Sequence, residues 1–134
     1  MKKWPNIIFI FFVILLLKSC AFDLVHVKQI PAQIEQNKLP ASSFELLDEV
    51  NIKLDSGYSR KLKKATKWHY VGTISQGDIF QTNDQVLTVE ASNIHEAYIV
   101  ISSPNIVGFY LPIEKTFSPV NDSQELKMRA ISNQ

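Results

Sequence analysis

The chain has 134 residues, a length that supports one domain with a single hydrophobic core. Fourteen lysine and arginine residues nearly balance thirteen aspartate and glutamate residues, so the composition excludes the strongly basic surface that nucleic-acid binding requires. The single cysteine excludes an intramolecular disulfide, and stability must therefore come from packing.

The first twenty residues have the pattern of an export signal. Two lysines precede an apolar run over residues 7–17, which is shorter than the roughly 20 residues that a transmembrane helix needs. Residues 17–20 then read Leu-Lys-Ser-Cys. This ending resembles the lipobox of bacterial lipoproteins, in which a signal peptidase cuts before the cysteine and the thiol carries a diacylglycerol. The resemblance implies a signal helix over residues 1–19 and a lipidated Cys20.

Ala21 stands where aspartate is usually associated with retention in the inner membrane, so the resemblance implies the periplasmic face of the outer membrane in a Gram-negative host. A diacyl unit with an N-acyl chain supplies the two anchors that stable attachment needs. An ordinary secretory signal with a chance thiol, or an uncleaved anchor helix, is the alternative interpretation. The three lysines of the signal leave with it, so eleven basic side chains remain against thirteen acidic ones.

Residues 20–43 are predicted to be a tether between the lipid and the folded domain, because the stretch is polar and is broken by two prolines. An edge strand over residues 23–30 is the alternative. A capping box follows the tether, with Ser42 as N-cap and Glu45 three residues later, and it predicts a helix of about two turns.

The β domain is predicted over residues 44–118, where short apolar stretches alternate with turn residues. The predicted strands cover residues 50–54, 67–74, 79–82, 86–91, 97–101 and 106–111. Alternation within the second of these places Trp68, Tyr70 and Ile74 on one face. The last two strands do not alternate, so both of their faces are expected to be covered, and they are predicted to form the central hairpin.

These strands predict a mainly β fold, with a small antiparallel sheet that curls into a barrel or a sandwich. Gly72, Gly77 and Gly108 lie within or beside strands, where glycine is typical of the bulges that curve a sheet. The strand number resembles that of bacterial SH3-like domains, a resemblance of size that implies no binding site. Residues 119–134 lose the pattern and are predicted to be a flexible tail.

His69, His95 and Glu96 are the candidates for a metal or acid–base site. Zinc needs three or four ligands that converge on one point, whereas His95 and Glu96 are adjacent and point to opposite faces of a strand. No serine lies in a G-x-S-x-G turn, and the four glycines are too far apart to form a phosphate loop. A non-enzymatic protein without metal or cofactor is favoured. A small periplasmic hydrolase or metal-binding protein that uses these three residues is the alternative.

Two further features are candidates for binding a partner. A basic run contains Arg60, Lys61, Lys63 and Lys64, and it is interpreted either as a patch for an anionic polymer or acidic partner, or as a solvated turn. Tyr110 and Phe117 are interpreted either as core or as an aromatic edge that binds protein. The sequence thus predicts a lipid-anchored envelope protein whose β domain binds another envelope protein or a cell-wall polymer.

Overall fold

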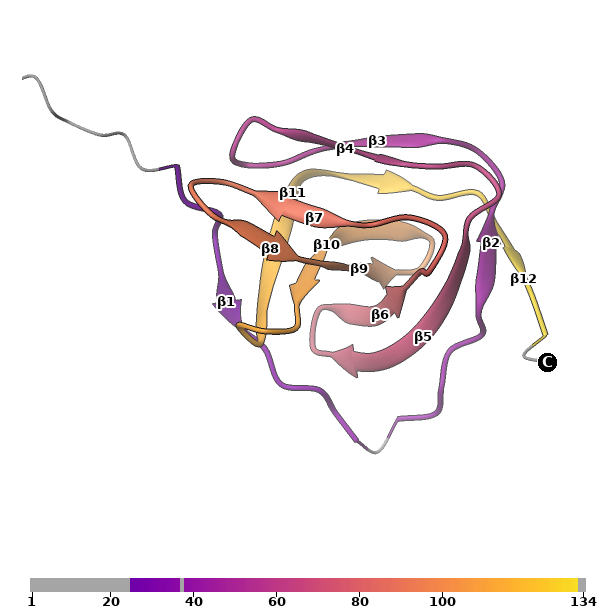
Figure 1. Cartoon of the computed structure of the whole chain (residues 1–134). Helices are drawn as coiled ribbons and strands as arrows, with labels where there is room; N and C mark the ends of the chain where they lie inside the picture. Colours follow the sequence, from indigo (N-terminus) through magenta and orange to yellow (C-terminus); the bar gives the residue numbers. More distant parts are fainter. Residues whose placement is uncertain (1–24, 37, 133–134) are drawn as a thin grey trace, which may run out of the picture.

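The computed structural model describes residues 25–36 and 38–132, which form twelve β-strands and no helix (Figure 1). The strands are β1 (Ile30–Pro31), β2 (Phe44–Leu46), β3 (Val50–Lys53), β4 (Ser59–Leu62), β5 (Lys67–Ile74), β6 (Gly77–Gln81), β7 (Thr88–Glu90), β8 (Ile94–Glu96), β9 (Tyr98–Ser102), β10 (Asn105–Leu111), β11 (Thr116–Glu125) and β12 (Met128–Ala130). The prediction of a mainly β, antiparallel fold is confirmed. Within this part of the chain, no helical span has the length and hydropathy needed to cross a membrane.

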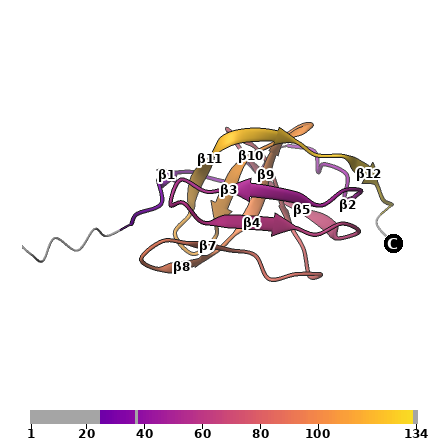
Figure 2. The same ribbon diagram turned by 90° about the horizontal axis from the view of Figure 1, so that it is seen from above.

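Eight of the strands form one antiparallel sheet in the order β1-β11-β10-β9-β6-β5-β2-β12. The hairpin of β9 and β10 has neighbours on both sides, as predicted for the most apolar pair. The sheet does not close on itself, because β1 and β12 end the order and do not pair with each other in the described chain. β3 pairs with β4, and β7 with β8, in two separate hairpins that lie over the curved sheet (Figures 1 and 2).

The two hairpins and one face of the sheet enclose the larger of two hydrophobic clusters. Trp68 and Phe109 are its largest fully buried side chains. The indole N–H of Trp68 donates to Thr66 Oγ1 at 2.8 Å, so the polar atom of this ring is satisfied inside the core. A second, smaller cluster lies on the opposite face of the sheet, since the neighbouring residues Ile99 and Val100 belong to different clusters.

Two bulges in the sheet explain why the predicted alternation fails within single strands. The register of β5 against β6 shifts between Tyr70 and Gly72. As a result, Trp68 and Tyr70 pack on the larger cluster, whereas Ile74 belongs to the smaller one. The same shift occurs in β10 between Ile106 and Gly108. The expectation that glycines mark bulges is confirmed at these two positions.

The prediction of a helix after Ser42 is wrong, because residues 44–46 form strand β2. Phe44 pairs with Trp68 of β5 and with Ala130 of β12. Its ring is 4% exposed and lies edge-on to Phe80, with centroids 5.0 Å apart. Burial of this aromatic ring in the sheet stabilises the fold more than a capping box would stabilise a helix of two turns.

The predicted flexible tail is also corrected, because β11 is the longest strand and covers residues 116–125. Its polar outer residues resemble a tail in the sequence, but β10 pairs with it along most of its length. Part of the predicted tether is also packed into the domain: β1 pairs with Phe117 and Thr116, and Val27 is buried. Cys20 and the predicted signal lie outside the described residues.

Gly108 is the position where the fold leaves least room for a side chain. A Cβ atom there would lie 2.4 Å from Ser118 O and 2.5 Å from the ring of Phe117. We therefore expect Gly108→Ala to lower the free energy of unfolding by at least about 2 kcal/mol, measured by urea denaturation.

Gly57→Ala is the control, because Gly57 has a φ of 87° but no atom within 4 Å of a Cβ. This variant should lose only about 1 kcal/mol, from backbone conformation alone. Equal losses in the two variants would contradict a packing role for Gly108.

Candidate binding site

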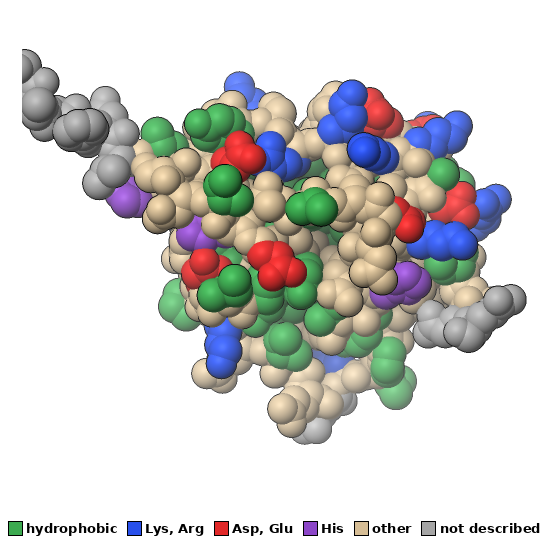
Figure 3. All heavy atoms as spheres, in the orientation of Figure 1, with side chains coloured by type: hydrophobic (Ala, Val, Ile, Leu, Met, Phe, Trp, Pro, Cys, Tyr) green, Lys and Arg blue, Asp and Glu red, His purple; other side chains and the backbone are tan. Residues whose placement is uncertain are grey.

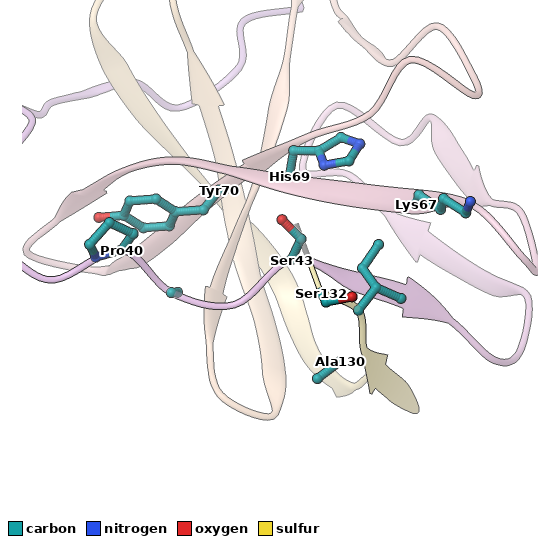
Figure 4. Close-up of a pocket in the computed structure, with 9 residues that line it drawn as sticks. Pro40, Ser43, Lys67, His69, Tyr70, Ala130 and Ser132 are labelled. Atoms are coloured by element: carbon teal, nitrogen blue, oxygen red, sulfur yellow. The ribbon is translucent and has the colours of Figure 1, made fainter. Parts of the chain in front are cut away.

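A cavity of about 950 Å³ lies beside β5. Its walls come from three segments that are far apart in the sequence, namely residues 40–43, β5 and residues 130–132. Figure 4 shows Lys67 and His69 along β5, Tyr70 and Pro40 together at one end, and Ser43 and Ser132 beside the strand.

The edge of β5 that borders this cavity is only partly paired. On that side β2 pairs with β5 as far as Trp68, and the backbone N–H of Glu35 donates to Thr73 O at 2.7 Å. Residues 69–72 lie between these points and have no strand partner on this side among the described residues. Pro40 has no N–H to donate, so the neighbouring segment is poorly suited to complete the ladder. A short length of strand edge is therefore left facing the cavity.

The side chains around this edge favour a partner that carries negative charge. Lys67 and His69 are exposed, and no Asp or Glu is among the residues that line the cavity. The ring of Tyr70 is held in place by its hydroxyl, which donates to Thr73 Oγ1 at 2.6 Å, while Thr73 Oγ1 donates to Asp78 Oδ1 at 2.7 Å. The site thus combines a fixed aromatic wall with a cation and an imidazole.

The C-terminal wall of the cavity is fastened to β2. Met128 and Ala130 pair with residues of β2, and the backbone N–H of Ile131 donates to Ser43 O at 2.9 Å. Arg129 also forms an ion pair with Glu45 at 3.1 Å. These contacts hold residues 130–132 next to residues 40–43, although the two segments are far apart in the sequence.

The residues of the predicted basic run differ in whether they form ion pairs. Arg60 forms an ion pair with Glu90 at 2.6 Å, and its Nε donates to Thr88 O, so it joins the β3–β4 hairpin to the β7–β8 hairpin. Lys61 pairs with Glu49 at 3.0 Å. Lys63 and Lys64 are exposed, and no ion pair links them to a described carboxylate. Basic side chains gather above β4 and β5, with acidic ones among them (Figure 3).

Tyr110 and Phe117, the two rings of the predicted aromatic edge, lie in the smaller hydrophobic cluster. Each is 5% exposed, and they are cross-strand partners in β10 and β11. The structure therefore supports the interpretation of both rings as core.

His69, His95 and Glu96 are not brought together. His69 lines the cavity, whereas His95 Nδ1 lies 2.5 Å from Glu114 Oε1, in the turn between β10 and β11. Glu96 accepts a hydrogen bond from Tyr98 instead, at 3.4 Å. Within residues 25–36 and 38–132, no three His, Cys, Asp or Glu side chains are grouped closely enough to hold a metal ion.

Sequence reasoning did not find Glu114 or the cavity. Glu114 lies in a stretch without periodic pattern, and nothing in the sequence links it to His95. The local signal that points toward the cavity is the stretch of residues 67–70, in which the exposed Lys67 and His69 alternate with aromatic residues. Comparison of the chain with protein-family models, with curated proteins and with solved structures found no match.

Glu114 should make the stability of the fold depend on pH. Burial would raise the pKa of its carboxyl, but the hydrogen bond from His95, a backbone hydrogen bond and the charge of His95 outweigh burial, and the pKa lies below 4.5. A lowered pKa means that the carboxylate stabilises the folded state above pH 4.5, and that this contribution is lost as the pH falls through the folded pKa.

We therefore expect Glu114→Gln to be less stable than the wild-type chain at about pH 7, with a smaller difference at about pH 3, when urea unfolding is measured at both. His95→Gln, which removes the partner, should reduce the same pH-dependent difference. A loss of equal size at both pH values would show that the Glu114 charge does not contribute.

Proposed function

We propose that this protein is a lipid-anchored envelope protein of non-enzymatic binding type. In this proposal Cys20 carries the acyl chains, and the protein is held on the periplasmic face of the outer membrane. Its β domain binds an extended segment of another envelope protein along the free edge of β5. The observation that carries the binding part of the proposal is this unpaired edge at residues 69–72 beside a cavity lined by Lys67 and His69.

Strand addition suits such an edge because the backbone of a bound peptide makes the hydrogen bonds that give affinity, while nearby side chains give specificity. Pairing of β2 with β5 brings Phe44 opposite Trp68 and stops there. A peptide of about four residues would continue the interrupted ladder up to the bridge between Glu35 and Thr73. An acidic side chain in that peptide would lie beside Lys67 and His69 and gain charge-assisted hydrogen bonds.

The placement of the cavity also supports the proposal. The first described residues leave the domain at one end, beside the β7–β8 hairpin, whereas β12 and β2 lie at the other end (Figures 1 and 2). A lipid attached at Cys20 would hold the first end toward the membrane. The cavity would then face the periplasm, where Lys63 and Lys64 would add positive charge near its border.

Site-specific cross-linking in intact cells tests the proposal. A photoreactive amino acid in place of His69 is expected to cross-link to one envelope protein. The same amino acid in place of Tyr58 serves as the control, because Tyr58 is 46% exposed and lies in the turn between β3 and β4. Lys67→Gln in the cross-linking chain should lower the yield roughly fivefold to tenfold, as loss of one charged contact predicts.

Equal products from both positions, or no product from the cavity position, would contradict strand addition at β5. Attachment to cell-wall polymer in place of protein would overturn the choice of partner.

A further inference from the structure

Two exposed isoleucines lie in neighbouring segments at one end of the domain. Ile94 is 72% exposed in β8, and Ile113 is 75% exposed in the turn between β10 and β11. The side chains of their chain neighbours, His95 and Glu114, form a hydrogen bond of 2.5 Å, so β8 and the turn between β10 and β11 are held together. We call Ile94 and Ile113 the apolar tips.

The N-terminal segment leaves the domain at this same end. The backbone N–H and the hydroxyl of Ser92 both donate to Val25 O, at 2.8 and 2.9 Å. Ser92 lies only two residues before Ile94, and Val25 is itself 41% exposed. Figure 3 shows hydrophobic side chains reaching the surface on this side of the molecule.

The distance to the proposed anchor is short compared with the domain. Five residue steps separate Cys20 from Val25, and a fully extended chain of that length spans at most about 18 Å. A domain of roughly 100 residues has a radius of gyration of about 13 Å and is more than about 30 Å across. A lipid on Cys20 would therefore keep the Val25 end of the domain beside the bilayer.

Charge around the apolar tips is close to balanced, which favours a contact made by apolar side chains. Lys115, two residues after Ile113, and Glu96, two residues after Ile94, are both exposed and carry opposite charges. His95 is the partner of Glu114, so this carboxylate does not stand alone next to the tips. A contact of this kind depends little on ionic strength.

We propose that the apolar tips lie in the headgroup region of the membrane that holds Cys20, so that the domain rests on the bilayer in a fixed orientation. This inference depends on the lipid anchor of the proposed function. Two isoleucines suit a lipid surface better than a second protein, because a specific protein interface buries about 800 Å² on each partner.

Fluorescence quenching in vesicles tests the orientation. The lipidated chain, purified from the membrane fraction so that acylation blocks the Cys20 thiol, would carry Ile94→Cys or Ile113→Cys labelled with bimane. It would be reconstituted in vesicles of phosphatidylethanolamine and phosphatidylglycerol that contain a doxyl-labelled phospholipid. Val86→Cys is the matched control, since Val86 is an apolar residue 90% exposed. Hydrogen bonds from Lys63 and Lys67 to Gln85 and Asp84 place its loop beside the opposite end of the domain.

We expect the label at either apolar tip to be quenched at least threefold more strongly than the label at Val86, at both low and high salt. Equal quenching at the three positions, in protein that floats with the vesicles, would overturn the orientation and leave the anchor standing. If the labels at Ile94 and Ile113 were also protected from water in detergent, without a bilayer, a second copy of the chain would be covering them. That result would also overturn the proposed orientation. A chain that does not float with the vesicles would contradict the lipid anchor and this inference together.

Discussion

The close backbone approach at Gly108 is the constraint on which the rest of the structure depends. A Cβ atom at Gly108 would lie only 2.4 Å from Ser118 O, so the position admits only glycine. The register of β10 shifts beside it, between Ile106 and Gly108. The shift turns later residues to the opposite face, so that Phe109 packs in the larger cluster and Tyr110 in the smaller one. A second shift near Gly72 does the same in β5. In β10, Ile106 and Phe109 thereby pack in the same cluster although they are three residues apart, a spacing that places residues of a regular strand on opposite faces.

The curved sheet also gives the domain two different ends. At one end β2 and β12 complete the sheet beside β5, and the pairing of β5 is interrupted beside the cavity that Lys67 and His69 line. At the other end the N-terminal segment is fastened to the β7–β8 hairpin through Ser92. Arg60 connects the two covering hairpins through Glu90 and Thr88. The proposed binding site and the proposed membrane attachment are thus compatible within one small domain, because they would use opposite ends.

Local patterns in the sequence predicted the parts of the fold whose stability is local. The alternation of Trp68 and Tyr70, and the apolar runs of β9 and β10, identified strands correctly because most of these side chains pack into the two hydrophobic clusters. The capping box at Ser42 failed because Phe44 gains more from packing on Phe80 than a short helix would gain. The long strand β11 was missed because polar residues on an exposed face carry no strand signal, and its pairing with β10 decides its conformation. The cavity and the pair of His95 with Glu114 depend on contacts between distant segments, which no local pattern specifies.

The central claim is that an anchor at Cys20 makes one end of this domain face a membrane and leaves the β5 edge open to a partner. Its most direct test is the intact mass of the mature protein from the membrane fraction, beside a Cys20→Ala variant. The account predicts a chain that begins at Cys20 and carries acyl chains, with both features lost in the variant. A mass without acyl chains, whether the chain is shortened or begins at Met1, would contradict it.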